Sequence, residues 1–366
     1  MTSRKLKILY VITSLRFGGA EKLVAELSLR FKEEGNEVDV FVLDGTETPY
    51  TAQLEKHGIT ILRASRGGYR QMWNIRHFKK LKVLLGKNHY DIVHTHNTPA
   101  QLIAYLAKPK IKGNTKFITT EHNTYNRRRA IPLFKIFDRK MYEFYDKIIC
   151  VSEATRRNLL HFLSISTPAD KFVTVYNGID FSKYSWENID KPQESEGKKI
   201  ILMVAAFRKQ KDQPTLIRSL KYLPGNYAVW FAGDGTRRSK CEKLARKLGF
   251  ETRVKFLGDR SDVARLYGMA DIIVMSSHYE GMSLSSIEAL ESGKPFIASD
   301  VDGLREVTEG AGLLFESGND KELAQKILSV GESEELSRDI SEKCRNKAKD
   351  FEFANTFYHH KMIYSQ

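Results

Sequence analysis

Short β-branched or apolar runs recur along this chain of 366 residues, and each is followed by a longer segment with helical spacing of its apolar residues. Such continuous runs are typical of strands buried on both faces of a parallel sheet. One series comprises residues 7–13, 38–43, 59–62, 91–94, 116–120, 147–151 and 173–176, and a second comprises 200–205, 227–232, 254–257, 272–275, 295–298 and 313–315. The pattern predicts an α/β fold with two doubly wound domains.

The two series are separated by residues 183–198, where a proline, a glycine and several charged side chains interrupt the periodicity. This composition is typical of a linker. We therefore expect a first domain over residues 1–182 and a second over residues 199–350. Residues 351–366 are rich in Phe and Tyr, which a final helix needs if it packs back on the first domain.

Composition excludes several classes of protein. A chain that is 41% hydrophobic is not intrinsically disordered. Its three cysteines, Cys150, Cys241 and Cys344, form neither a CxxC pair nor a disulfide framework, which favours a reducing cytosol. No run approaches the roughly 18–20 apolar residues that span a bilayer. We expect a cytoplasmic protein that is at most peripheral to a membrane.

Positive charge is concentrated in the first half of the chain. Residues 1–180 hold 30 Lys and Arg against 17 Asp and Glu, a net charge of +13, whereas the whole chain carries +14. Such asymmetry indicates a polyanionic partner of that half, which is nucleic acid, an anionic membrane or a phosphorylated substrate.

A helical wheel over residues 126–148 separates an apolar side from a basic one. The apolar side has Phe134, Phe137, Met141 and Phe144, and the basic side has Arg128, Lys135 and Arg139. Residues 67–87 add further cations. Because no nucleic-acid-binding motif occurs and aromatic residues are not interleaved with the Arg cluster, we expect the basic side to face an anionic membrane surface rather than nucleic acid.

The first candidate binding element is the glycine pair Gly18-Gly19, which leads into a helix after the first predicted strand. In open α/β sheets ligands bind beyond the carboxyl ends of the strands. Adjacent glycines let backbone N–H groups approach a phosphate at a helix N-terminus. A plain tight turn explains the pair equally well.

The second candidate is a pair of carboxylates, Glu280 and Glu288, eight residues apart. If Ser283 opens a helix, the backbone of Gly281, Met282, Ser283 and Leu284 offers N–H donors on which a diphosphate could sit. Glu288 could then accept hydrogen bonds from sugar or ribose hydroxyls. By spacing alone, a solvated charged helix is the simpler interpretation.

Taken together, these motifs resemble the retaining glycosyltransferases of family 4. The resemblance covers nearly the whole chain and rests on Gly18–Glu21, His96, His122, Asn177–Asp180, Gly233–Gly235, Phe256–Gly258, Glu280…Glu288, Gly293–Pro295 and Gly303…Glu306. It implies the GT-B architecture, in which two Rossmann-like domains face each other across a cleft.

The resemblance also implies roles for the donor-site residues. Glu288 matches the carboxylate that holds the ribose, and Glu280 the one near the donor sugar. Lys211 matches a lysine on the diphosphate. The arginine that the family has five residues earlier is Ala206 here, and Arg208 is the candidate replacement.

The histidines belong to the first domain. His122 matches a family histidine near the donor sugar, and we expect His96 to face the acceptor side while His94 lies in the core. A zinc site on these three residues lacks supporting Cys or carboxylate spacing. We interpret Asp300-Val301-Asp302 as a loop and helix cap, so no metal or other cofactor is expected.

The expected reaction is transfer of a hexose from a UDP- or GDP-linked sugar to an acceptor hydroxyl, with retention at the anomeric carbon. The expected acceptor is a saccharide or lipid-linked glycan of bacterial surface polysaccharide assembly, reached from the inner face of the cell membrane. The departing diphosphate would be stabilised by Lys211, Arg208 and backbone N–H groups. Two alternatives stay open, a sugar-nucleotide epimerase of the same shape and a non-catalytic basic module that binds membranes or nucleic acid.

Overall fold

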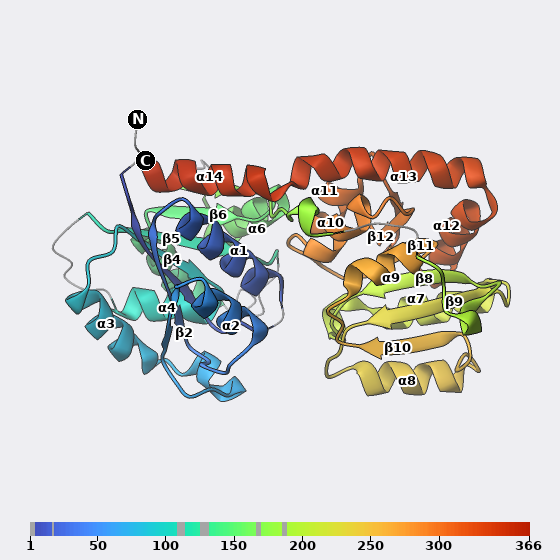
Figure 1. The fold of residues 1–366 in the computed structure, drawn as a ribbon, viewed down its shortest axis with the longest axis horizontal. Coiled ribbons are helices and arrows are strands. Elements are labelled where there is room, and N and C mark those ends of the chain that lie inside the picture. The colour runs from blue at the N-terminus through green and yellow to red at the C-terminus, as the bar shows by residue number, and fades with distance from the viewer. Residues whose placement is uncertain (1–3, 17, 108–113, 125–131, 166–169, 185–188) are drawn as a thin grey trace. The chain divides into compact units, whose positions relative to one another are not determined.

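The computed structural model describes residues 4–16, 18–107, 114–124, 132–165, 170–184 and 189–366 (Figure 1). The chain divides into two compact units. The first unit contains Met1–Tyr176 and Phe357–Gln366, and the second contains Asn177–Thr356. The predicted pair of doubly wound α/β domains is confirmed.

A parallel sheet of seven strands, in the order β3-β2-β1-β4-β5-β6-β7, forms the centre of the first unit. Its strands are β1 (Lys7–Ile12), β2 (Glu37–Val42), β3 (Thr60–Arg63), β4 (Ile92–His96), β5 (Lys116–Glu121), β6 (Lys147–Cys150) and β7 (Phe172–Thr174). The central strands are buried, which explains their continuous apolar runs. Every strand of the first series is found where the sequence predicts it, within a few residues.

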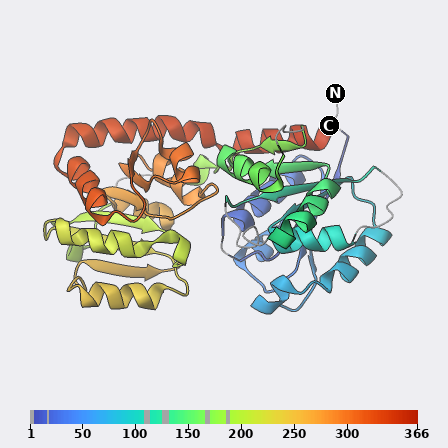
Figure 2. The same cartoon turned by 180° about the vertical axis from the view of Figure 1, so that it is seen from behind.

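Helices lie on both faces of this sheet (Figure 1, Figure 2). They are α1 (Gly19–Glu33), α2 (Pro49–Lys56), η1 (Tyr69–Trp73), α3 (His77–Lys87), α4 (Thr98–Ala107), α5 (Pro132–Phe144) and α6 (Glu153–Leu163). The helices α3, α4, α5 and α6 share one hydrophobic core with the sheet. Each helix contributes a buried side chain to it, in this order Leu81, Ile103, Met141 and Leu159, and β4 contributes Val93.

The second unit has a parallel sheet of six strands in the order β10-β9-β8-β11-β12-β13. Its strands are β8 (Lys199–Val204), β9 (Tyr227–Ala232), β10 (Val254–Gly258), β11 (Ile272–Met275), β12 (Phe296–Ser299) and β13 (Leu313–Phe315). Its helices are η3 (Phe181–Lys183), η4 (Gln193–Ser195), η5 (Lys209–Lys211), α7 (Gln213–Ser219), η6 (Leu220–Tyr222), α8 (Arg238–Lys247), α9 (Val263–Met269), α10 (Leu284–Glu291), α11 (Asp302–Thr308), α12 (Asp320–Glu332), α13 (Glu334–Ala348), η7 (Lys349–Phe351) and the first turn of α14 (Phe353–Ser365).

The crossing between the units lies at Tyr176–Asn177, a few residues before the expected end of the first domain at residue 182. The reason is local pairing. Ile179 forms a parallel bridge with Glu352, and the Asn177 N–H donates to Met282 Sδ at 3.2 Å. These contacts attach the segment to the second unit.

The C-terminal residues return to the first unit at Phe357. The rings of Phe357 and Tyr364 lie 4.7 and 4.9 Å from the ring of Phe31 on α1. Lys361 Nζ also approaches Glu34 Oε2 at 2.6 Å. Among the described helices, none is long and apolar enough to cross a bilayer.

Candidate functional site

A largely buried ion pair lies beyond the carboxyl ends of β8 and β11 in the second unit. Lys211 Nζ donates to Glu280 Oε1 at 2.5 Å, and Ser277 Oγ donates to the same oxygen at 2.7 Å. Gln210 Nε2 approaches Glu280 Oε2 at 3.3 Å. Glu280 is only 6% exposed, so its charge requires these partners.

Backbone contacts hold the two loops of this ion pair together. The His278 N–H donates to the Gln210 carbonyl at 2.7 Å, and Ser276 Oγ donates to the Asp212 carbonyl at 2.9 Å. Asp212 itself has φ +45°, a left-handed conformation that costs free energy in a non-glycine residue. The loops are therefore fixed by tertiary contacts rather than by local preference.

Two glycines allow a third loop, residues 233–235, to lie close to the backbone of Ala205 and Phe207. Gly233 has φ +135° and Gly235 has φ +152°. A Cβ on Gly233 would lie 2.3 Å from the Ala205 carbonyl oxygen, and one on Gly235 would lie 2.6 Å from that of Phe207. The Gly-Asp-Gly motif is thus explained by a close backbone approach beside the ion pair.

The predicted helix start at Ser283 is found. Ser283 is the N-cap of α10, and its side chain makes no capping hydrogen bond to the helix N-terminus. The first-turn N–H groups of an α-helix have no partner within the helix, so this terminus suits an anion. Gly281 just before it touches the start of α11, because a Cβ on Gly303 would lie 2.1 Å from the Gly281 carbonyl oxygen.

Glu288 lies further along α10 and is 8% exposed. Its Oε1 accepts a hydrogen bond of 2.7 Å from the hydroxyl of Tyr184. The buried phenol of Tyr267 lies beside the same carboxylate, and its pKa is raised well above the usual value, mainly by burial and then by Glu288.

Arg208 is exposed and does not join the ion pair. Within the described part of the chain its guanidinium has no hydrogen bond or salt bridge. Ala206, where the family arginine is expected, accepts a hydrogen bond of 3.1 Å on its carbonyl from Gln213 Nε2. Of the two cationic candidates, Lys211 alone lies against Glu280.

In the first unit, Gly18 is the N-cap of α1, which begins at Gly19. The carboxylate of Glu21 folds back on this turn, because a Cβ on Gly18 would lie 2.2 Å from Glu21 Oε2. A side chain at position 18 would therefore displace Glu21.

The histidines form one buried cluster. His96 Nδ1 lies 3.0 Å from His122 Nε2, and the rings of His94 and His96 are 4.2 Å apart. His94 also contacts the Tyr364 hydroxyl at 2.6 Å through Nδ1 and Thr120 Oγ1 at 2.8 Å through Nε2. His94 lies in the core as expected.

His96 is fully buried, and its expected place on the acceptor side stays a prediction. Residues two apart on a strand share one face, so His96 lies on the same covered face as His94. Its Nε2 has no partner among the described residues. His122 is partly buried beside it.

Burial keeps these imidazoles neutral. It lowers the pKa of His94 and of His96 well below the ordinary value, and neighbouring histidines lower both further. Burial and then His360 lower the pKa of His122 to about 3.

The predicted basic side is only partly described, because Arg128 lies outside the described residues. On α5, Lys135 Nζ donates to Ser164 Oγ at 2.6 Å and Arg139 pairs with Glu143 at 3.5 Å. Both side chains are near solvent but already have partners.

A second basic surface lies on η1 and α3. Residues 64–90 contain seven Lys and Arg and no Asp or Glu. All seven cations are exposed, namely Arg66, Arg70, Arg76, Lys79, Lys80, Lys82 and Lys87. Four large apolar side chains on the same segment are more than half exposed, namely Tyr69, Trp73, Ile75 and Val83. We call these eleven residues the α3 surface.

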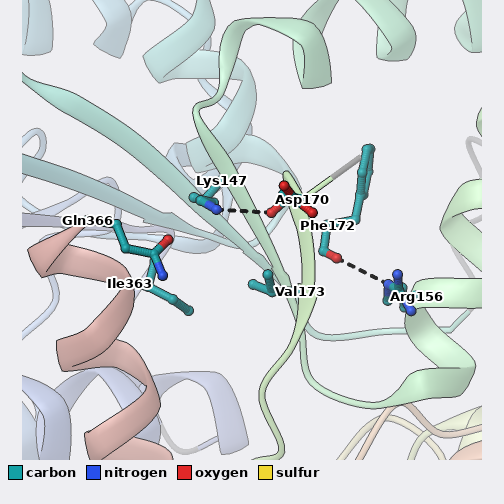
Figure 3. A pocket seen from close by; sticks show the side chains of 7 residues that line it. All are labelled: Lys147, Arg156, Asp170, Phe172, Val173, Ile363 and Gln366. Atoms are coloured by element: carbon teal, nitrogen blue, oxygen red, sulfur yellow. Dashed lines mark hydrogen bonds between the residues drawn. The ribbon is translucent and has the colours of Figure 1, made fainter. Parts of the chain in front are cut away.

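A pocket also lies near the amino ends of β6 and β7, away from the carboxyl edge of the sheet (Figure 3). Its two cations are engaged. Lys147 Nζ donates to the Asp170 carbonyl at 3.0 Å and Arg156 Nε donates to the Phe172 carbonyl at 3.1 Å. These bonds support the edge strand β7.

Asp300 and Asp302 lie at the start of α11. Arg305 Nε donates to Asp300 Oδ1 at 2.5 Å, and Asp302 is the first residue of the helix. In the part of the chain that the structure describes, no three His, Cys, Asp or Glu side chains are arranged to hold a metal ion.

Some residues of the site were not identified from the sequence. Ser277 lies three residues before Glu280 in the sequence, and Gln210 directly precedes Lys211. A search for polar residues next to the two predicted ones could therefore have found both. Tyr184 is 104 residues from Glu288 and had no such signal.

Two family models match the chain. The model described as Glycosyltransferase Family 4 matches residues 17–183, and the one described as Glycosyl transferases group 1 matches residues 185–347. The chain is 27% identical over 341 residues to the N-acetyl-alpha-D-glucosaminyl L-malate synthase of Bacillus anthracis. The matched region covers 90% of this chain and 88% of that enzyme.

The chain is also similar to the O-antigen biosynthesis glycosyltransferase WbnH of Escherichia coli, with 24% identity over 314 residues that cover 85% of this chain and 86% of WbnH. Among solved structures, HepE of Anabaena in complex with UDP and glucose superposes with a TM-score of 0.82 and 20% identity. That match covers 99% of this chain and 100% of HepE, and it shows a shared fold.

The buried imidazoles predict a loss of stability on acidification. An unfolded histidine has a pKa of about 6.5. Since the folded pKa values of His94, His96 and His122 lie lower, the unfolded chain binds more protons below about pH 6.5. The free energy of unfolding should be fully present above that pH and fall by up to about 1.4 kcal/mol per pH unit for each imidazole below it.

Urea midpoints measured between about pH 7.5 and pH 5 check this expectation. The variant His359→Gln is the control, because His359 is exposed and its loss should leave the slope unchanged. A wild-type midpoint that does not move over this range would contradict the neutral cluster.

Proposed function

The chain belongs to the glycosyltransferases of family 4 and has the GT-B fold, and on this basis we propose that it transfers a sugar from a nucleoside diphosphate donor to an acceptor hydroxyl with retention at the anomeric carbon. The observation that carries the proposal is the Lys211–Glu280 pair beyond the carboxyl ends of β8 and β11. In this pair a cation, which suits a diphosphate, and a carboxylate, which suits sugar hydroxyls, lie in direct contact.

Donor binding would use the second unit. A carboxylate accepts hydroxyl hydrogen bonds well, which suits Glu288 to the ribose and Glu280 to the sugar. The uncapped terminus of α10, with Gly281 to Leu284, would receive the diphosphate. Lys211 and the exposed Arg208 would add positive charge. The complex of HepE with UDP makes UDP the first nucleotide to test.

In the transfer itself, the bond from the anomeric carbon to the diphosphate oxygen breaks and the bond to the acceptor oxygen forms on the same face. The acceptor proton passes to the departing phosphate. Lys211 would stabilise the negative charge on that phosphate, because it is held in place before the reaction begins. His122, as a neutral imidazole, would contact the donor sugar, and Gly18 and Gly19 would offer N–H groups to the diphosphate.

The acceptor is proposed to be a saccharide or lipid-linked glycan of bacterial surface polysaccharide assembly, in line with relatives such as WbnH. We place the enzyme in the cytoplasm and on the inner face of the cell membrane. The support is the basic first unit, now including the α3 surface, where cations and exposed apolar side chains occur together as a membrane surface requires.

Incubation with UDP- and GDP-sugars tests the reaction class. A glycosyltransferase turns over only with an acceptor, apart from slow hydrolysis, whereas an epimerase converts the donor alone. Conversion of the donor sugar without acceptor would overturn the proposal.

Replacement of Glu288 should weaken nucleotide binding. Hydrogen bonds to a charged group are worth about 1.5–3 kcal/mol each, so Glu288→Ala should lower UDP affinity by about tenfold or more. Isothermal titration calorimetry measures it, and Glu251→Ala, an exposed carboxylate of the same unit, is the control. Equal affinities in wild type and Glu288→Ala would remove the ribose role.

Transfer should not depend on a divalent metal. Asp300 is engaged by Arg305, and the proposed charge on the diphosphate is met by Lys211 and backbone N–H groups. Activity in excess EDTA should stay within about twofold of that in Mg²⁺. The opposite result would be loss in EDTA, recovery with Mn²⁺ or Mg²⁺, and a matching loss in Asp300→Ala.

The α3 surface should bind anionic vesicles. Each cation near such a surface contributes about 1 kcal/mol, and the attraction is screened beyond about 10 Å at 0.1 M salt. Wild type should therefore sediment with phosphatidylglycerol vesicles at low salt but not at high salt. Reversal of Lys79, Lys82 and Lys87 to Glu should abolish sedimentation.

Two further variants locate the surface. Reversal of Arg128, Lys135 and Arg139 tests the side predicted from the helical wheel, and reversal of Lys240, Lys243 and Lys247 on α8 is the matched control in the second unit. Equal loss in the α8 variant, or wild type that binds RNA and ignores the vesicles, would contradict the proposed surface.

A further inference from the structure

The segment that leaves the first unit delivers one side chain to Glu288. Tyr184 follows the single turn of η3, and its hydroxyl donates to Glu288 Oε1 at 2.7 Å. The turn is fixed by its own cap, since Asp180 Oδ1 accepts from the Ser182 N–H at 3.1 Å and from Ser182 Oγ at 2.6 Å.

The residues just before this turn are attached to the second unit at several points. The Ile179 N–H donates to the Phe351 carbonyl at 3.0 Å, and the Ile179 carbonyl accepts from the Phe353 N–H at 2.9 Å. Gly178 has no room for a side chain, because a Cβ there would lie 2.8 Å from the Glu352 carbonyl oxygen. The motif Asn177–Asp180 therefore fixes the backbone from which Tyr184 reaches Glu288.

Asn177 connects the same segment to the donor loop. Its N–H donates to Met282 Sδ at 3.2 Å, and its Nδ2 lies 3.5 Å from the Met282 carbonyl. Met282 directly precedes the N-cap of α10, the helix that carries Glu288. The crossing segment therefore contacts α10 at two places. Asn177 binds Met282 just before the helix, and Tyr184 binds Glu288 within it.

A phenol and a ribose hydroxyl are chemically alike as ligands of a carboxylate. Each is a neutral O–H group that donates one hydrogen bond to an anionic oxygen. A carboxylate that is 8% exposed must keep a donor when no nucleotide is bound, because an unpaired buried charge is costly. The hydroxyl of Tyr184 supplies one such donor, beside the buried phenol of Tyr267.

We propose that Tyr184 is a displaceable internal ligand of the donor site, whose hydroxyl occupies on Glu288 the position of a ribose hydroxyl and leaves when a nucleoside diphosphate binds. This inference rests on the proposed function, because it takes Glu288 as the ribose carboxylate. Binding then exchanges one hydrogen bond for another, so Tyr184 lowers the affinity for nucleotides that carry ribose hydroxyls. It also provides the donor that replaces the ribose as the nucleoside diphosphate product leaves.

The variant Tyr184→Phe tests the exchange, because it removes only the hydroxyl from a partly buried ring. UDP should bind about threefold to tenfold more tightly to the variant than to wild type, since ribose no longer displaces a hydrogen bond to a charged group. The affinity for 2′,3′-dideoxyuridine diphosphate, which has no ribose hydroxyl to offer Glu288, should stay within about twofold.

Tyr222→Phe is the matched control, because Tyr222 is an exposed tyrosine of the same unit. Calorimetry gives the affinities, and the unfolding temperature of each variant confirms that it is folded. Weaker or unchanged UDP binding in Tyr184→Phe would overturn the proposal. An equal gain for both nucleotides would overturn it as well, because the ring rather than the hydroxyl would then be responsible.

The same measurements separate this inference from the function on which it rests. Wild type that binds neither UDP nor GDP would overturn the donor proposal and the role of Tyr184 together. Wild type that binds UDP and is weakened by Glu288→Ala, but not altered by Tyr184→Phe, would overturn the role of Tyr184 alone.

Discussion

Parallel strand order is the constraint on which the rest of the structure depends. All strands of a parallel sheet end at the same edge, so residues far apart in the chain meet in the loops beyond that edge. In the second unit this brings Lys211, after β8, to Glu280, after β11. In the first unit it brings His96, at the end of β4, to His122, after β5. Each candidate site is therefore a product of topology.

Burial then decides which partners these side chains take. A charge or polar atom removed from water needs a hydrogen-bond partner, and the described part of the chain supplies one for each candidate carboxylate. Glu280 has Lys211 and Ser277, and Glu288 has Tyr184. A bound donor would have to replace or share these partners, so the internal bonds of the free protein set part of the binding affinity.

The sequence was informative wherever a structural feature depends on near neighbours in the chain. Apolar runs gave the strands of both sheets, because burial on two faces excludes polar residues from a strand. The helix start at Ser283 also follows from a short motif. These local features carry the resemblance to family 4, which the family models confirm over both halves of the chain.

Only the tertiary structure decided which polar groups meet. The spacing of His94 and His96 placed them on one face, but the residues that cover that face, such as His360 and Tyr364, lie more than 260 positions away. Lys135 on the predicted basic side binds Ser164, which is 29 residues away and which a helical wheel cannot reveal. Tyr184 reaches Glu288 because the contacts of Asn177 and Ile179 attach the crossing segment to the second unit. Chain spacing determines which face a side chain occupies, whereas long-range packing determines what it contacts there.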